Sequence, residues 1–299
     1  MRPEVRALEE AMAREGYIAD DAIATALLLA DELRKPLLVE GDAGVGKTEI
    51  AKVLSRLKGT ELIRLQCYEG LDVSTALYEW NYPRQMLRVR MAEREGLEPG
   101  QMEQAVFGRG YLLERPLLRA ICRREGPAVL LIDEVDRADE AFEAFLLEVL
   151  SDFQVTIPEL GTIRAEHVPH VVLTSNCTRE IGDALRRRCL YLHLDHPSLE
   201  KEVAILRTRV PGATAALAEE IGRFLRALRQ RRLMRRPGVA ESIDWAQALV
   251  RLHADHLDPA TVRSTLGCIV KDRRDQHDLD EEELARLVAL AASPEALAS

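Results

Sequence analysis

Gly41-Asp42-Ala43-Gly44-Val45-Gly46-Lys47-Thr48 matches every fixed position of the pattern G-x-x-x-x-G-K-[ST], and no other segment is as informative about the fold. Its glycines allow a tight turn and a close backbone approach, which a residue with a Cβ resists at positive φ. Residues 36–40 form a short apolar run typical of a buried parallel strand, and residues 49–54 favour a helix. This order of strand, loop and helix predicts a phosphate-binding loop, and a glycine-rich turn that ends in Lys-Thr by chance is the alternative.

The loop pattern assigns a role to its polar groups. Lys47 would reach the β and γ phosphates of a nucleotide as a catalytic residue, and Thr48 would hold Mg²⁺ through its hydroxyl. We therefore predict ATP and Mg²⁺ as cofactors. The residues predicted to contact the nucleotide are Gly41, Asp42, Ala43, Gly44, Val45, Gly46, Lys47, Thr48 and Glu49.

The composition is that of an ordinary globular protein. A chain of 299 residues is long enough for one large domain with a smaller companion, and its net charge of −9 argues against a general affinity for nucleic acid. The longest apolar run, residues 22–30, is too short to span a bilayer. No cleavable leader is visible at residues 1–4, and the five cysteines form no C-x-x-C pair. We therefore expect a cytoplasmic protein with reduced thiols and no membrane span.

Four more segments have the composition of strands and are separated by helical stretches: residues 61–65, 128–133, 170–176 and 189–194. Together with residues 36–40 they predict an α/β fold, a P-loop αβα sandwich whose sheet has about five parallel strands. β-branched residues around a Pro-Glu-Leu-Gly turn predict an inserted hairpin near 154–166. We expect this nucleotide-binding αβα domain, with helices at its N-terminus, to cover residues 1–196.

The strand pattern ends at Pro197. Beyond it the periodicity of apolar residues predicts about four or five helices. We therefore expect a smaller, all-helical domain over residues 197–299. Phosphates bind at the carboxyl ends of parallel strands, so polar residues that directly follow a strand are the candidates for chemistry.

Asp133 and Glu134 come directly after the aliphatic residues of the predicted strand 128–133. Asp133 would complete the Mg²⁺ shell through water, because Mg²⁺ prefers oxygen ligands and retains several waters. Glu134 would polarise the water that attacks the γ-phosphate. A purely structural pair at a strand end is the alternative. In combination with the glycine loop, the pair favours hydrolysis over phosphoryl transfer to a small molecule.

Asn176 ends the predicted strand 170–176. Its amide would hydrogen-bond the attacking water or the γ-phosphate, which makes it a catalytic candidate. A turn-forming residue at the end of a strand is the alternative, and in isolation the two interpretations are about equally plausible.

Three arginines, Arg186, Arg187 and Arg188, end a predicted helix just before the last strand. A guanidinium stays charged and grips transition-state oxygens in a planar fork, so one of them is a candidate arginine finger for a neighbouring subunit. The alternative is that arginines favour helix C-termini because they meet the helix dipole there. A second basic run, residues 231–236, is typical of a solvated helix face more than of a nucleic-acid patch, although Arg235 or Arg236 could reach a phosphate.

Taken in chain order, these motifs resemble those of the AAA+ ATPases over nearly the whole chain. Residues 41–48 are similar to Walker A, residues 130–134 to Walker B and Asn176 to sensor 1. The arginines before the last strand are similar to the arginine finger, and the helices after Pro197 are similar to the lid.

Among the AAA+ ATPases the chain looks most like the MoxR branch. The resemblance is carried by Glu134-Val135-Asp136-Arg137-Ala138, by the predicted hairpin and by Arg-Arg-Cys at 187–189. Residues 78–85 (Tyr-Glu-Trp-Asn-Tyr-Pro-Arg-Gln) and 236–245 (Arg-Pro-Gly-Val-Ala-Glu-Ser-Ile-Asp-Trp) are similar to the CoxD-type accessory ATPases associated with aerobic carbon monoxide dehydrogenase.

The resemblance implies a ring-forming ATPase, usually a hexamer, that works with a partner protein carrying a von Willebrand factor A domain. It implies a chaperone-like remodeller whose ATP hydrolysis helps a client metalloenzyme to mature or to receive its cofactor. For the CoxD type that client would be a molybdenum-copper carbon monoxide dehydrogenase. The resemblance also aligns the arginine finger with Arg188, and with Arg187 second.

The chain departs from the shared motifs at one position, and the resemblance implies an insert at another. Where related proteins place a sensor 2 arginine at the start of a lid helix, this chain has Glu241 in Ala240-Glu241-Ser242. Residues 70–115 are expected to hold an inserted helical element that faces the substrate side of the ring, because loops after the second strand point that way in this family.

Two other functions compete with the leading hypothesis of an ATP-hydrolysing remodeller. The first is a DNA-dependent AAA+ ATPase, a loader or helicase accessory, which rests on the basic run 231–236 and ranks lower because the chain is acidic. The second is a small-molecule kinase, which needs only the glycine loop. The helical C-terminal third argues against the kinase, and nucleic acid is not an expected partner.

Overall fold

The computed structural model describes residues 2–95, 98, 101 and 106–293, which divide into two compact units. The first, here called the sheet unit, contains Met1–Leu8, Asp21–Glu40 and Thr48–His193. The second, here called the lid unit, contains Glu9–Asp20, Gly41–Lys47 and Leu194–Ser299. All of the glycine loop except its last residue, Thr48, therefore belongs to the lid unit.

Five parallel strands form the main sheet. They are β1 (Leu37–Gly41), β2 (Leu62–Gln66), β5 (Val129–Asp133), β8 (His170–Ser175) and β9 (Leu190–Leu194), in the spatial order β2-β5-β8-β1-β9. The register pairs Gln66 with Asp133, and Ile132 with Leu173. β1 and β5 are buried along their whole length, as expected for parallel strands covered on both faces. The predicted α/β fold with a five-stranded parallel sheet is confirmed.

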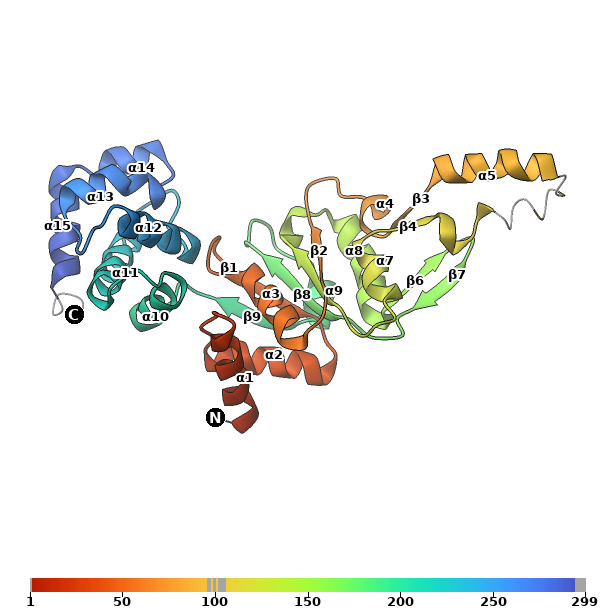
Figure 1. The fold of residues 1–299 in the computed structure, drawn as a ribbon, viewed down its shortest axis with the longest axis horizontal. Helices are drawn as coiled ribbons and strands as arrows, with labels where there is room; N and C mark the ends of the chain where they lie inside the picture. The colour runs from red at the N-terminus through yellow and green to blue at the C-terminus, as the bar shows by residue number, and fades with distance from the viewer. Residues whose placement is uncertain (1, 96–97, 99–100, 102–105, 294–299) are drawn as a thin grey trace. The chain divides into compact units, whose positions relative to one another are not determined.

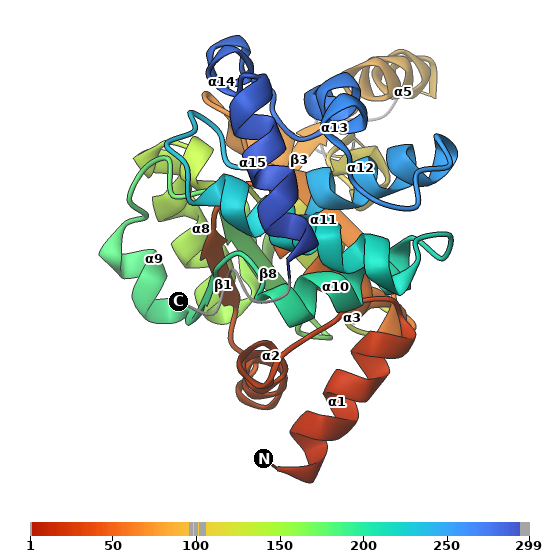
Figure 2. The same ribbon diagram turned by 90° about the vertical axis from the view of Figure 1, so that its left-hand side faces the viewer.

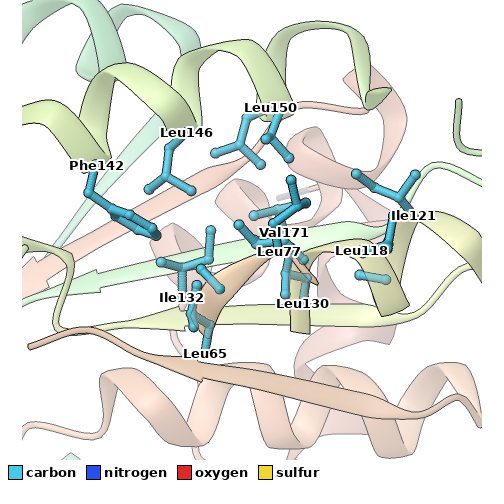
Figure 3. Close-up of a cluster of buried hydrophobic side chains, with 14 of the residues drawn as sticks. Leu65, Leu77, Leu118, Ile121, Leu130, Ile132, Phe142, Leu146, Leu150 and Val171 are labelled. Carbon is cyan, nitrogen blue, oxygen red and sulfur yellow. The ribbon is translucent and has the colours of Figure 1, made fainter. Parts of the chain in front are cut away.

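Helices flank the sheet strands (Figure 1), and α7 (Pro116–Cys122) packs against β2 and β5. The helices before β9 also include α1 (Pro3–Arg14), α2 (Asp21–Leu33), α3 (Lys47–Lys58), α8 (Glu140–Asp152) and α9 (Asp183–Arg188). On α8 the apolar residues Phe142, Leu146 and Leu150 recur every fourth position and so share one face. This face packs toward Leu130 and Ile132 of β5 (Figure 3). The resulting core fixes β5 and the acidic residue at its end.

Two small antiparallel sheets extend the sheet unit. β3 (Tyr78–Trp80) pairs with β4 (Leu112–Glu114), and β6 (Gln154–Ile157) forms a hairpin with β7 (Gly161–Arg164). In the chain, α4 (Val73–Ala76) precedes β3, whereas α5 (Tyr82–Glu95) and the 3₁₀ helix η1 (Arg109–Tyr111) follow it. α5 extends beyond the β3–β4 pair (Figure 1). Of the predicted insert at 70–115, residues 96–97, 99–100 and 102–105 lie outside the described part of the chain.

The lid unit is helical over the described residues that follow β9. Its helices are α10 (Leu199–Arg209), α11 (Ala215–Arg229), α12 (Val239–Arg251), α13 (Pro259–Thr265), η3 (Leu266–Cys268), α14 (Arg273–Asp278) and α15 (Glu281–Ala292). α11 packs against α15 (Figure 2). Phe224 of α11 and Trp245 of α12 are fully buried, with ring centroids 5.2 Å apart, and Trp245 Nε1 donates to Thr265 Oγ1 at 2.8 Å. The predicted helical C-terminal region is confirmed.

Candidate nucleotide-binding site

The glycine loop turns between β1 and α3 with a backbone that few residue types tolerate. Gly44 has a φ of +80°, in the left-handed region that favours glycine. Gly41 is restricted by a neighbour, because a Cβ there would lie 2.2 Å from the carbonyl oxygen of Leu194 at the end of β9. The glycines of the sequence pattern are therefore required by the backbone geometry at these positions.

Lys47 begins α3 and turns its ammonium group back onto the loop. Its Nζ donates to the carbonyl oxygen of Gly41 at 2.7 Å and to that of Asp42 at 2.6 Å, and the residue is buried. A buried ammonium needs such acceptors, and charged phosphate oxygens accept stronger hydrogen bonds than carbonyl groups do. The loop thus holds a desolvated cation that can exchange carbonyl partners for phosphate.

Asp133, at the end of β5, accepts hydrogen bonds from three other elements. Its Oδ1 accepts from Thr48 Oγ1 at 3.1 Å and from Thr174 Oγ1 at 2.5 Å, and its Oδ2 accepts from Arg64 at 2.5 Å. The carboxylate is buried. The structure brings together Thr48 and Asp133, the two residues predicted to hold Mg²⁺. Thr174 and Arg64 were not identified from the sequence, because they reach Asp133 only through the pairing of β8 and β2 with β5.

The donor set at Thr48 and Asp133 fits Mg²⁺. A hydroxyl and a carboxylate are hard oxygen ligands, and Mg²⁺ is commonly bound by one or two protein oxygens together with water and phosphate oxygens. Among residues 2–95, 98, 101 and 106–293, three or more His, Cys, Asp or Glu side chains nowhere gather in a way that could hold a metal ion. The remaining ligands of Mg²⁺ at this pair would therefore come from the nucleotide and water.

Glu134 follows with a left-handed backbone, φ +55° and ψ +49°. This conformation is uncommon for a residue with a side chain and costs on the order of 1 kcal/mol, so its neighbours must hold it. Its N–H donates to Thr174 Oγ1 at 3.0 Å, and its Oε2 accepts from Arg137 at 3.1 Å in the 3₁₀ helix η2 (Val135–Arg137). The side chain is 32% exposed, so water can reach the carboxylate. A strained residue with an accessible carboxylate can act as a general base.

Asn176 follows β8, and a buried acidic side chain holds its backbone. The N–H of Asn176 lies 3.2 Å from both carboxylate oxygens of Asp136, and Thr178 donates to Asp136 from its N–H at 2.9 Å and from its hydroxyl at 2.6 Å. Asp136 is buried. It thus joins the segment after β5 to the segment after β8. The sequence placed Asp136 in the segment that resembles the MoxR branch, but it did not indicate this contact.

The three arginines of α9 have different surroundings. Arg186 donates to both carboxylate oxygens of the buried Glu40, at 2.6 and 2.7 Å, and lies over the ring of Tyr191. Arg187 and Arg188 are exposed at the end of α9, where Arg188 Nε donates to Ser151 Oγ at 2.5 Å. Within the sheet unit, the two predicted finger residues are therefore accessible, whereas Arg186 is occupied in an internal ion pair.

Glu241, in the first turn of α12, takes part in capping that helix. Its Oε2 accepts from the N–H of Gly238 at 3.0 Å.

His196 lies near Asp42 of the glycine loop, with its Nε2 3.3 Å from Asp42 Oδ2. Burial lowers the pKa of His196 and the charge of Arg229 lowers it further, while Asp42 opposes both.

Among the described residues, every helix is too short or too polar to cross a membrane.

Known proteins resemble the nucleotide-binding region of the chain, and some of them resemble most of its length. Residues 36–189 match the family described as AAA domain (dynein-related subfamily). Gas vesicle ATPase GvpN of Haloferax mediterranei is 27% identical over 84% of this chain and 73% of its own length. GvpN2 of Halobacterium salinarum is 28% identical over 91% of this chain and 81% of its own length. Chaperone protein ClpB 2 of Parasynechococcus marenigrum is 35% identical over 48% of this chain and 14% of its own length.

Among solved structures, the RuvB Holliday junction branch migration motor of Thermotoga maritima covers 92% of this chain, and the match extends over 71% of that motor. It is 17% identical, with a TM-score of 0.48. The family match covers more than half of the chain, and it includes the glycine loop and the acidic pair after β5. The chain therefore belongs to the AAA domain family (dynein-related subfamily) and is an AAA+ ATPase.

Proposed function

We propose that this AAA+ ATPase is a chaperone-like remodeller of the MoxR type, which hydrolyses ATP to help a client metalloenzyme mature or receive its cofactor. The observation that carries the hydrolytic part is the cluster around Asp133, where Thr48 and Thr174 bind one carboxylate oxygen and the strained Glu134 follows. The names of the relatives, gas vesicle ATPases and a chaperone, support a role in assembly.

In the proposed reaction, Lys47 and the loop N–H groups bind the phosphates of ATP, and Thr48 and Asp133 hold Mg²⁺. Bound Mg²⁺ supplies positive charge to the phosphate oxygens. Glu134 accepts the proton of the attacking water, and Asn176 orients that water. Glu134→Gln should therefore lower phosphate release at least about 100-fold while the variant still binds ATP, since removal of a general base typically costs that much.

We also propose that each site is completed by a neighbouring subunit in a homo-oligomer, most simply a hexamer. Arg187 and Arg188 are exposed, as a residue that acts in another subunit must be. Arg188→Ala and Glu134→Gln should each be inactive alone. Mixed in equal amounts, they should recover up to about a quarter of the wild-type turnover, because random neighbours then form intact sites.

Arg187→Ala mixed with Glu134→Gln shows which of the two arginines acts. If neither mixture recovers turnover while size-exclusion chromatography shows normal assembly, the proposal that a neighbouring subunit completes each site is wrong.

The proposed client is a molybdenum-copper carbon monoxide dehydrogenase, and the proposed partner carries a von Willebrand factor A domain. The support is the resemblance of residues 78–85 and 236–245 to CoxD-type ATPases. Co-expression of such a dehydrogenase with the wild-type chain should raise its copper content over co-expression with Glu134→Gln. Equal copper content would reject this client and leave the ATPase activity standing.

The DNA-dependent alternative is not favoured. In the lid unit, Arg231 pairs with Glu283, and Asp275 accepts hydrogen bonds from the N–H of Met234 at 3.1 and 3.0 Å. A cavity of about 490 Å³ beside this run is lined by three arginines and five carboxylates: Arg231, Arg232, Arg286, Asp275, Asp278, Asp280, Glu282 and Glu283. Carboxylates in excess repel a phosphate backbone.

A further inference from the structure

The first turn of α12 is bonded to the glycine loop within the lid unit. The N–H of Val239 donates to the carbonyl oxygen of Gly44 at 2.8 Å, and the N–H of Ala240 donates to the same oxygen at 3.3 Å. N–H groups in the first turn of a helix lack partners within that helix. The Gly44 carbonyl therefore satisfies two donors of α12.

Two glycines allow this contact. A Cβ on Gly238, the residue before α12, would lie 2.7 Å from Gly44 Cα and 2.8 Å from the carbonyl oxygen of Ala43. Gly238 has a φ of −87°, which any residue can adopt, so the close approach and not the conformation requires glycine there. A Cβ on Gly44 would in turn lie 3.0 Å from Glu241 Oε2.

The contact fixes the orientation of one peptide group of the loop. In a planar trans peptide, the C=O of Gly44 and the N–H of Val45 point in opposite directions. When α12 holds the carbonyl, it therefore turns the Val45 N–H away from the helix. This N–H is one of the donors that a loop of this pattern turns toward phosphate.

We infer that the start of α12 is a backbone clamp on the glycine loop, and that the clamp sets the affinity for nucleotide by orienting the Val45 N–H. The inference rests on the proposed function and adds the means by which the lid regulates its site. The carboxylate of Glu241 would repel phosphate, and it caps α12 next to the loop. Gly238 and Val239 are positioning residues, because they act through the loop peptide.

The clamp is anchored in the buried core of the lid unit. Arg229 Nε donates to the carbonyl oxygen of Pro237 at 2.8 Å, and Ser242 Oγ lies 2.9 Å from that of Gly238. Glu202 accepts hydrogen bonds from both Arg229 and Ser242. A movement of these lid helices therefore moves the start of α12 and its contact with the loop.

Val239→Pro tests the clamp directly. Proline is tolerated at the first position of a helix, and Gly238 already has the extended conformation that proline requires before it. The substitution thus removes the donated N–H and preserves α12. Val239→Ala is the matched control, because it shortens the side chain and keeps the N–H.

The measurement is the release of a fluorescent ADP analogue from the full-length chain in the presence of Mg²⁺, followed by stopped flow. We expect release about tenfold faster for Val239→Pro and close to the wild-type rate for Val239→Ala, since a lost hydrogen bond typically changes affinity by about this factor. Circular dichroism verifies that each variant is folded.

Gly238→Ala tests the same contact by steric exclusion and should also release the analogue faster. Gly267→Ala is its control, because a Cβ there would meet Gln276 Nε2 at an ordinary 3.9 Å. If Val239→Pro and Gly238→Ala are folded and release the analogue at the wild-type rate, the proposed clamp is wrong. The proposed ATPase function is not affected by that result. If the wild-type chain binds no analogue, the proposed function itself fails.

Discussion

Two arginine–glutamate pairs, one in each unit, share their chemistry and differ in their surroundings. In the lid unit Arg229 donates from Nη1 and Nη2 to the two oxygens of Glu202, both at 2.7 Å. In the sheet unit Arg186 donates from Nη2 to the two oxygens of Glu40. Both glutamates are buried, but the arginine side chain is 9% exposed in the lid pair and 39% exposed in the sheet pair.

The two pairs indicate that burial of the arginine determines how firmly such a pair joins its elements. Arg229 also donates to Pro237, and Glu202 also accepts from Ser242, so the lid pair is bonded to protein on all sides. Arg186 lies over the ring of Tyr191, 5.4 Å from its centroid, and more than a third of its side chain is exposed to water. The lid pair is thus a rigid joint between helices, and the sheet pair is an adjustable link between β1 and α9.

Breaking the lid pair has the largest expected effect. Glu202→Ala leaves the buried charge of Arg229 without a counter-ion, which costs about 3–5 kcal/mol of the free energy of unfolding. Urea unfolding is followed through Trp245 of the lid unit in a Trp80→Phe background. The control is Glu200→Gln, because Glu200 is exposed on the same helix. If Glu202→Ala lowers the free energy of unfolding no more than this control does, the lid pair is not a rigid joint.

Breaking the sheet pair has a smaller expected effect on stability and a visible effect on turnover. Arg186→Ala removes the cation beside Glu40, but Tyr191 still bonds this carboxylate and water can enter where the 39% exposed arginine stood, so we expect a cost of about 1–3 kcal/mol. Arg186→Lys keeps the charge, loses the planar fork and should be intermediate. Glu40 directly precedes the glycine loop, so phosphate release should also slow in Arg186→Ala. Wild-type turnover in that variant would show that the link does not reach the site.

The charge of Arg229 also affects how the stability of the lid unit depends on pH, because it acts on His196. Because the pKa of His196 is lowered by burial and by Arg229, the unfolded chain takes up the proton first as the pH falls. The lid unit should therefore lose stability below about pH 6.5, the pKa of an unperturbed histidine, and keep it above that value. Urea unfolding followed through Trp245 at several pH values on both sides of about 6.5 gives the slope of the free energy of unfolding against pH.

Two histidine variants assign that slope. His196→Gln should flatten it. His170→Gln changes a histidine of the sheet unit whose pKa is also lowered by burial, and it should leave the slope at Trp245 unchanged. The reverse pattern would show that His196 is not the source of the pH dependence measured at Trp245.

The smallest expected effect concerns Cys189, which directly follows α9. Burial raises the pKa of its thiol to about 12, so the reactive thiolate is scarce at neutral pH. Arg186→Ala removes one attachment of α9 and should speed the alkylation of Cys189 severalfold, as measured by mass spectrometry. The exposed Cys177 is the reference, and an equal increase at both thiols would indicate general loosening instead.

The sequence was sufficient for features that lie in one continuous segment. The glycine loop, the fully buried strand before Asp133 and the helices after Pro197 each have a local signal in composition or period. The sheet and the helical C-terminal region could therefore be predicted. The domain limits at 196 and 197, and the roles of the site residues, remain predictions.

Contacts between distant segments could not be predicted from the sequence. Arg64 and Thr174 reach Asp133 through strand order and register, which no local pattern encodes. The contact between Gly44 and Gly238 depends on how α12 is placed within its unit. The sequence showed only that Glu241 stands where related proteins have an arginine. Its role as a cap could not be predicted, because it depends on the position of the Gly238 backbone.

Gly41 has a consequence for how variants of the loop are interpreted. Its lack of a side chain is enforced by the carbonyl of Leu194, a protein neighbour, at 2.2 Å from where a Cβ would stand. An inactive Gly41→Ala variant would therefore be no proof that this residue touches phosphate, since displacement of β9 would explain the defect equally well. The residues of the glycine loop are thus restricted in two separate ways, by the ligand that the loop binds and by the strand β9 beside it.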